Sequence, residues 1–196
     1  MTRDCVISAD EKTSIQARQL RHPIEPPNPG NVMKVEAEYV RKGALAYLAA
    51  WDVRNARLFG LCEKTTGIVP FSRLVHQVMS VEPYASADRV FWILDNASYH
   101  RGQSCVERLV AEWPNIVPIH LPIHASWLNQ IEIYFSILQR KAITPSNSAS
   151  LLELEEQILG FQAIYQQTAK PFEWRFTRKD LKALMNRISA REKLVA

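Results

Sequence analysis

The sequence has few cysteines and no long apolar run, and each shortage excludes a class of protein. Its three cysteines, Cys5, Cys62 and Cys105, are odd in number, far apart and free of any CxxC pair. This pattern predicts neither a disulfide framework nor a zinc knuckle, and it is typical of reduced thiols in the cytosol. The apolar runs are also far shorter than the roughly 20 residues that cross a bilayer, so we expect no membrane partner.

Signatures of secretion and of serine or cysteine hydrolases are missing as well. Thr2 to Asp4 lead directly into a strand-like segment, so we expect no signal peptide. Ser98 and His100 lie close together in the sequence, but no GxSxG elbow surrounds them, and Cys105 has no catalytic-type neighbours. The chain also has no internal repeat and no low-complexity tract.

The composition that is present suits a globular domain. The chain has 196 residues, of which 47% are hydrophobic and 22% charged. This is enough apolar material for one domain, or for one domain with a helical appendage, without stabilising disulfides. The formal net charge is +4 and the isoelectric point about 9.0. This mild basic excess is compatible with nucleic-acid binding, but many basic proteins bind nothing anionic.

The hydrophobic pattern predicts strands in the first part of the chain and helices later. Residues 22–31 hold four prolines and a glycine and are predicted to be a loop. Residues 44–53 read as a strand, although their alanines also allow a helix, and the continuous apolar run 89–94 suits a central strand buried on both faces. The predicted strands are residues 5–9, 13–18 (returning as a hairpin), 44–53, 89–94 and 116–121, and the predicted helices are 71–79, 104–113, 127–142, 151–165 and 177–189. This order favours an α/β fold with helices packed on a central mixed sheet.

Three acidic residues occupy positions where they could support chemistry. Asp10 is predicted to end the first strand, Asp95 follows the strand at 89–94, and Glu132 lies on the long helix at 127–142. Acids at neighbouring strand ends converge at one edge of a sheet, and a helix over that edge can add a third. Three hard oxygen donors favour Mg²⁺ or Mn²⁺ over zinc. Two such ions about 4 Å apart can promote phosphodiester chemistry.

Plainer interpretations stay open for each acid. Asp95 and Asn96 suit the start of a turn, and Glu132 suits a solvated helix surface. Glu132 shares its predicted polar face with Asn129, Ser136 and Gln139. Asp52 is a fourth candidate of the same kind, because it also ends an apolar run.

Longer segments around these acids resemble a known family. The segment LDNASYH (94–100), followed by LPIHASWLNQIEIYFSILQRKAI (121–143), closely resembles the catalytic core of bacterial insertion-sequence transposases of the mariner superfamily, the insertion sequence 630 type. ADEKTSIQAR (9–18) matches the first acidic motif of that family, and residues 38–53 and 169–177 resemble its flanking segments. The 36 residues between Asp95 and Glu132 are a typical spacing for the family.

The resemblance implies a ribonuclease H-like fold with a central mixed five-stranded sheet flanked by helices. It implies that Asp10, Asp95 and Glu132 form a catalytic triad that binds two Mg²⁺ or Mn²⁺ ions, and it leaves Asp52 as a strand-end residue. It further implies cleavage of double-stranded DNA at transposon ends and transfer of the freed 3′-hydroxyl to target DNA. We expect residues 1–145 to form the catalytic core and 146–196 a helical extension packed on or beside it. A homodimer and a bacterial, cytoplasmic, nucleoid-associated location are the matching expectations.

Residues near the triad carry weaker expectations. His100 and His124 either contact phosphate or a metal-bound water, or are structural histidines. Asn96 and Asn129 either position DNA or the carboxylates, or cap local backbone. Trp127 is expected to be a packing anchor rather than a base-stacking platform. Candidate phosphate contacts, each of which is alternatively a solvated surface charge, are Lys12, Arg41, Lys42, Arg101, Arg140 and Lys141.

One expected part of the family's architecture has no place in this sequence. Family members carry helix-turn-helix modules before the catalytic domain, whereas here the first predicted strand begins at Cys5. We therefore expect the chain to be a fragment, one product of a split reading frame, or a decayed copy. Two hypotheses follow: an enzyme core that cuts and joins DNA, or a non-enzymatic remnant that binds DNA or dimerises. The three intact acids favour the first, and the missing module favours the second.

Overall fold

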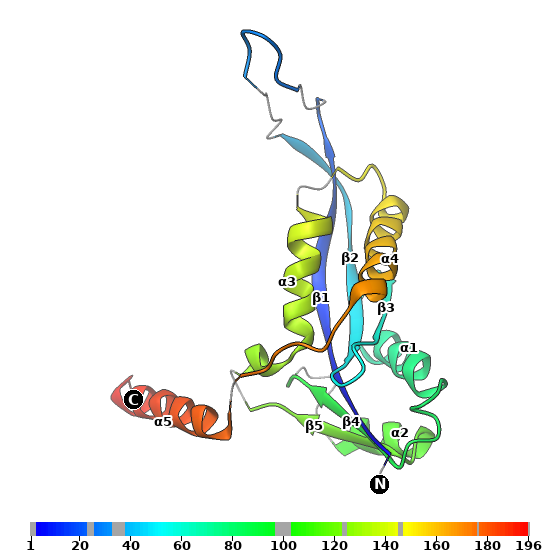
Figure 1. Ribbon diagram of the computed structural model, residues 1–196, viewed down its shortest axis with the longest axis vertical. Helices are drawn as coiled ribbons and strands as arrows, with labels where there is room; N and C mark the ends of the chain where they lie inside the picture. The colour runs from blue at the N-terminus through cyan, green and yellow to red at the C-terminus, as the bar shows by residue number, and fades with distance from the viewer. Residues whose placement is uncertain are drawn as a thin grey trace.

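A five-stranded mixed sheet forms the centre of the protein (Figure 1). The computed structural model describes residues 3–22, 26–32, 38–96, 103–122, 125–144, 147–175 and 177–195. The strands are β1 (Asp4–Leu20), β2 (Tyr39–Asp52), β3 (Leu58–Glu63), β4 (Arg89–Leu94) and β5 (Ile116–His120). Their order across the sheet is β3-β2-β1-β4-β5, with β1, β2 and β3 antiparallel and β1, β4 and β5 parallel. The predicted α/β class with a mixed five-stranded sheet is confirmed.

Helices cover both faces of this sheet. The helices of the described ranges are α1 (Ile68–Met79), α2 (Gln103–Glu112), α3 (Ile131–Leu138), α4 (Leu151–Thr168) and α5 (Arg178–Val195). One apolar core lies between the sheet and α1 and α2, and a second lies between the sheet and α3 and α4. Helix α5 projects away from the sheet in Figure 1. None of the helices in the described ranges is long and apolar enough to cross a membrane.

Strand β1 is one long strand, so the prediction of two strands paired as a hairpin is wrong. Its register against β2 slips between Lys12 and Ile15, and Ser14 in this bulge has a positive φ of 57°. A bulge adds one residue to one strand and so reverses which face the following side chains occupy. Before it, Ile7 belongs to the core under α1, whereas Ile15 after it belongs to the core under α3 and α4. Asp10 therefore lies within a strand rather than at its end.

Two further predictions need correction, and one strand was not predicted. Strand β4 is not equally buried on both faces, since Trp92 is fully buried whereas Phe91 and Ile93 are only half-buried. The predicted helix 127–142 is broken into a 3₁₀ turn (Ser126–Leu128), α3 and a π-helical turn (Gln139–Ile143). Strand β3 was not predicted, because it has only six residues and follows a polar turn.

The close packing of β3 against β2 and α4 predicts that Gly60→Ala is destabilising. A Cβ at Gly60 would lie 2.7 Å from Gln162 Oε1 and closer still to the hydroxyl of the buried Tyr47. Overpacking of this kind costs about 1–3 kcal/mol, which urea denaturation would measure as a lower midpoint. Gly160→Ala on α4 is the matched control, because a Cβ at Gly160 would meet nothing within 4 Å and alanine favours helix by up to about 1 kcal/mol. Equal stability of the two variants would contradict the prediction.

Candidate functional site

Adjacent parallel strands bring Asp10 and Asp95 together. The last residues paired between β1 and β4 are Ser8 and Ile93, and each acid lies two positions further along its strand. Continuing the same register places Asp10 beside Asp95, at the edge where the two strands part. The negative charge of Asp95 is one of the causes that raise the pKa of Asp10, as expected for two carboxyls on adjacent strands.

Glu132 approaches the same edge from α3. It lies in the first turn of that helix, where the positive end of the helix dipole favours a carboxylate. Its burial raises the pKa of Glu132, the charge of Lys12 lowers it, and the charge of Asp95 raises it again. Glu132 in turn contributes to the raised pKa of Asp10. The structure therefore brings the three predicted acids within electrostatic range of one another.

Asp10 is the most strongly perturbed of the three. It is 8% exposed, and burial is the largest cause that raises its pKa to about 7. The backbone N–H of Glu11 donates to Asp10 Oδ1 at 2.8 Å and opposes this shift. Three further carboxylates, Asp95, Glu11 and Glu132, raise it. When this site ionises, it holds negative charge that water solvates poorly and that a bound cation would neutralise.

The donor set fits a hard cation, but the geometry is not closed around one. All three side chains offer carboxylate oxygens, which suit Mg²⁺ or Mn²⁺ better than zinc. Within the described ranges, however, no three His, Cys, Asp or Glu side chains are close enough to hold a metal ion. The two observations are compatible, because charges interact over far longer distances than the roughly 2.1 Å of an Mg²⁺–oxygen bond.

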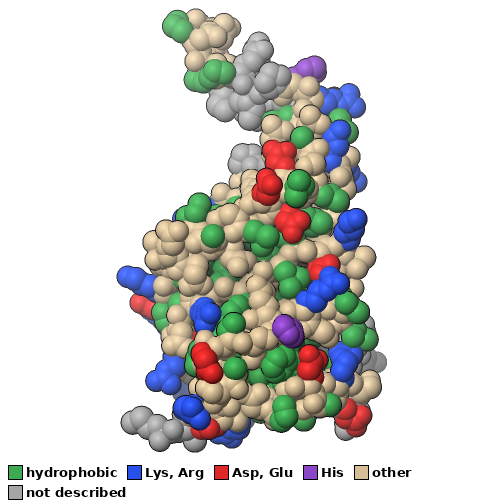
Figure 2. All heavy atoms as spheres, turned by 90° about the vertical axis from the view of Figure 1, so that its right-hand side faces the viewer, with side chains coloured by type: hydrophobic (Ala, Val, Ile, Leu, Met, Phe, Trp, Pro, Cys, Tyr) green, Lys and Arg blue, Asp and Glu red, His purple; other side chains and the backbone are tan. Residues whose placement is uncertain are grey.

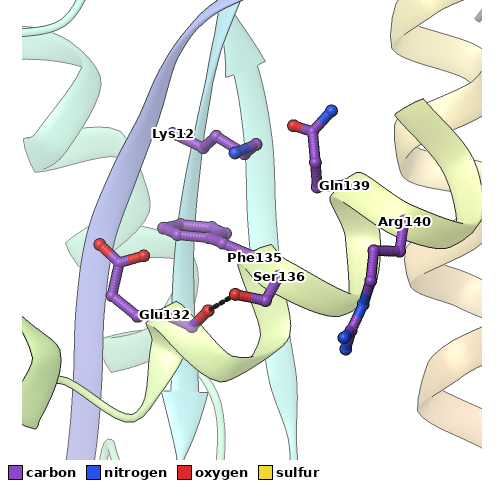
Figure 3. Close-up of a pocket in the computed structure, with 6 residues that line it drawn as sticks. All are labelled: Lys12, Glu132, Phe135, Ser136, Gln139 and Arg140. Carbon is purple, nitrogen blue, oxygen red and sulfur yellow. Dashed lines mark hydrogen bonds between the residues drawn. The ribbon is translucent and has the colours of Figure 1, made fainter. Parts of the chain in front are cut away.

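A groove of about 350 Å³ lies beside Glu132 (Figure 3). Lys12 enters it from β1, and the other residues come from α3 and the π-helical turn. In Figure 3 the Glu132 carboxylate and Lys12 flank the ring of Phe135, whereas Arg140 is directed away from Lys12. The groove is lined by Lys12, Glu132, Phe135, Ser136, Gln139 and Arg140. Two of the six predicted phosphate contacts, Lys12 and Arg140, thus border one groove next to a predicted catalytic acid.

The other predicted basic contacts are not gathered there. Arg41 and Lys42 are exposed on β2, with Arg41 paired to Arg18 beyond the bulge, and Lys141 is exposed without lining the groove. Figure 2 shows the side of the molecule that carries α1, where blue and red side chains are interspersed rather than gathered in a basic patch. The predicted contacts of His100, Arg101 and His124 lie outside the described residues.

The structure also places three other residues that were predicted to lie near the triad: Asn96, Asn129 and Trp127. The Asn96 amide donates to the backbone carbonyl of Leu121, so it ties the end of β4 to the end of β5. Asn129 was predicted to share the polar face of Glu132, but it is fully buried, because its backbone is extended and α3 begins only at Ile131. Trp127 is 41% exposed, more than a residue buried as a packing anchor would be.

Two further buried polar residues, Ser8 and Asp52, have structural roles. Ser8 is a buried hydroxyl that bonds Asn129, and its only signal in the sequence is a serine inside an apolar strand. Asp52 ends β2, as the resemblance implied, and is fully buried. Its carboxylate accepts hydrogen bonds from the turn to β3 and from the Tyr84 hydroxyl at 2.6 Å. Asp52 is therefore engaged in structure rather than turned toward the site.

Comparisons with known proteins bear on the family and the fold of this chain. The family model described as DDE superfamily endonuclease matches residues 6–155. The solved Mos1 mariner paired end complex with Mn is similar over 81% of this chain and 48% of its own, with 18% identity and a TM-score of 0.56. The Mos1 transposase paired-end complex with left transposon end is similar over 82% and 48%, with 14% identity and a TM-score of 0.52. No curated protein matches the chain.

At these identities the solved structures show a shared fold and no more. The chain spans about half the length of the solved relatives. Their likeness confirms the ribonuclease H-like architecture that the resemblance implied. Since the family model covers most of the sequence, the chain belongs to the DDE superfamily endonucleases.

Proposed function

We propose that this chain is the catalytic core of a DNA transposase of the mariner superfamily, insertion sequence 630 type. In this proposal Asp10, Asp95 and Glu132 are the catalytic and metal-binding residues. The reaction is cleavage of DNA at transposon ends, followed by attack of the freed 3′-hydroxyl on target DNA. The observation that carries the proposal is the electrostatic influence of Asp95 and Glu132 on Asp10 where β1 and β4 part, in a chain that the DDE endonuclease model matches.

The roles of the residues follow from their positions. Asp10 and Asp95 would present oxygens from adjacent strands, and Glu132 would present its oxygens from the first turn of α3. Bound Mg²⁺ or Mn²⁺ would supply activation of the attacking oxygen and stabilisation of the leaving one. Lys12 and Arg140 border the groove beside Glu132, and they would contact phosphates of the DNA strand.

The proposal also covers the partner, the oligomeric state, the location and the domain boundary of the chain. Double-stranded DNA is the proposed partner, since one solved relative is a complex with a left transposon end. A homodimer and a bacterial, cytoplasmic location belong to the same proposal. For the domain boundary, we keep a core of residues 1–145 and an extension of 146–196. The first helix of that extension, α4, buries Leu154 and Ile158 in the core under α3.

A second candidate function is a non-enzymatic remnant that binds DNA or dimerises. One observation favours it: within the described part of the chain, no three acidic, histidine or cysteine side chains gather closely enough to hold a metal ion. In that case the chain would keep its fold, but the three acids would bind divalent cations no better than any acidic surface.

Nicking of supercoiled plasmid DNA in Mn²⁺ distinguishes the two functions. We expect the wild-type chain to nick the plasmid and Asp95→Asn to lose this activity by on the order of 10³-fold, because a metal-binding carboxylate stabilises charge in the transition state by several kcal/mol. Asp88→Asn is the matched control, since Asp88 directly precedes β4, at the end opposite Asp95, and its carboxylate bonds the exposed Arg3. Equal nicking by wild type and Asp95→Asn would contradict the enzymatic function.

A further inference from the structure

Two buried polar side chains, Ser8 and Asn129, bond each other between β1 and the start of α3. Asn129 is 0% exposed and Ser8 is 1% exposed. Asn129 Nδ2 donates to the backbone carbonyl of Ala9 at 2.8 Å and to Asp10 Oδ2 at 3.2 Å. Asn129 Oδ1 accepts from the Ser8 hydroxyl, and the Ser8 oxygen accepts the backbone N–H of Ile131 at 2.9 Å. The side-chain bonds of the pair thus run between its two members, to β1 and to the first residue of α3.

These bonds join the two elements at the places that carry acids. Asp10 lies two residues after Ser8, and Glu132 lies three residues after Asn129. The N-terminus of α3 cannot slide along β1 without leaving a buried donor or acceptor unpaired, which is costly away from water. The pair therefore sets the register between the strand of Asp10 and the helix of Glu132.

The pair also fixes the Asp10 carboxylate itself. The N–H of Glu11 holds Oδ1 at 2.8 Å, and the Asn129 amide holds Oδ2 at 3.2 Å. Each oxygen keeps a second lone pair that neither donor occupies. Apolar side chains would hold α3 on the sheet with less desolvation, but they would leave the carboxylate free to rotate.

We infer that Asn129, held by Ser8, is a positioning residue for the proposed metal site. It orients Asp10 and sets the register of α3, so that Asp10 and Glu132 can bind the same divalent cations. The inference rests on the proposed function. Neither residue is assigned a contact with DNA or a part in proton transfer, because both are buried behind Asp10.

Binding of Mn²⁺ to the whole chain, measured by isothermal titration without DNA, tests this role. We expect Asn129→Ala to weaken Mn²⁺ binding by about 10- to 100-fold, the loss typical when a hydrogen-bond partner of a metal ligand is removed. Ser8→Ala should weaken it in the same direction by a smaller factor. Asn115→Ala is the matched control, because the Asn115 amide likewise donates two hydrogen bonds, here to the backbone carbonyls of Tyr84 and Ala87. Asn115 directly precedes β5, at the end of the sheet opposite Asp95.

Thermal unfolding in EDTA separates positioning from general stability. If Asn129→Ala and Asn115→Ala are both less stable but only the former loses Mn²⁺ affinity, the inference is supported. Unchanged Mn²⁺ affinity in Asn129→Ala and Ser8→Ala, alongside weaker binding in Asp10→Asn, overturns the inference and leaves the proposed function standing. A wild-type chain that binds no Mn²⁺ overturns both. If Asn129→Ala does not fold, Ser8→Ala decides by the same criterion.

Discussion

In metal-free buffer, wild-type protein should lose about 4 kcal/mol of unfolding free energy relative to Asp10→Asn as the pH rises from 4 to 8. The cause is the raised pKa of Asp10, which is about 7 in the folded protein against an ordinary value of 3.8. Each unit of difference between folded and unfolded pKa corresponds to about 1.4 kcal/mol, and this carboxyl is buried enough for that conversion to apply.

The direction follows from which state binds the proton more tightly. Between the two pKa values the folded chain keeps the Asp10 proton and the unfolded chain releases it, so stability falls as the pH rises. The contribution is fully present below about pH 3.8 and is lost as the pH passes through about 7. An amide at position 10 does not titrate, so Asp10→Asn should lack this part of the slope.

Urea denaturation at a series of pH values, with EDTA present, measures the difference. Glu11→Gln is the control, since it removes a neighbouring charge that is only a minor cause of the Asp10 shift and should keep most of the slope. Identical pH dependence in wild type and Asp10→Asn would show that Asp10 is not perturbed. The same Asp10→Asn variant should lose Mn²⁺-dependent nicking, because the proposed site loses a ligand. Such a cost to the fold is typical of a carboxylate retained for chemistry.

The sequence predicted the elements whose periodicity is local and uninterrupted. Helix α1 and strand β4 were found within a few residues of their bounds, because their apolar residues repeat with helical spacing or run continuously. The bulge at Ser14 hid the length of β1, since it reverses the alternation that marks a strand. The break before α3 was missed for a different reason. Asn129 bonds residues about 120 positions earlier in the chain, and no local pattern records such a contact.

The candidate site, too, was predicted only in part from the sequence. Asp10, Asp95 and Glu132 were proposed from strand ends and from the motifs around them, and the structure brings these three within electrostatic range. The motifs do not show which polar residues hydrogen-bond these acids, because that depends on side-chain geometry. Ser8 had almost no signal. Asp52 looked equivalent to the other acids by its position alone, whereas the resemblance left it as a strand-end residue, and it is bonded to a turn.

Replacing Asp52 with alanine should destabilise the protein by about 3–5 kcal/mol, because it leaves several buried donors without an acceptor. Asp52 is fully buried. Its Oδ1 accepts the backbone N–H groups of Arg54 and Asn55 at 2.9 Å each, and its Oδ2 accepts the Asn55 amide at 2.8 Å and the Tyr84 hydroxyl at 2.6 Å. Burial and this last bond raise the pKa of Tyr84 far above its ordinary value, so the phenol stays a donor.

Asp52→Asn provides a graded test of the same turn. Its remaining oxygen can still accept the two backbone N–H groups, whereas the Asn55 amide and the Tyr84 O–H, which both donate to Oδ2, lose that acceptor. The new amide can donate to the Tyr84 oxygen, which recovers part of this loss. We therefore expect a loss of about 1–3 kcal/mol, intermediate between wild type and Asp52→Ala. Asp88→Ala is the control, because that half-exposed residue should change stability by no more than about 0.5 kcal/mol. A loss below about 1 kcal/mol in Asp52→Ala would mean that water reaches the turn. Nicking per folded molecule should survive in both Asp52 variants, since this acid is committed to the turn and not to the site.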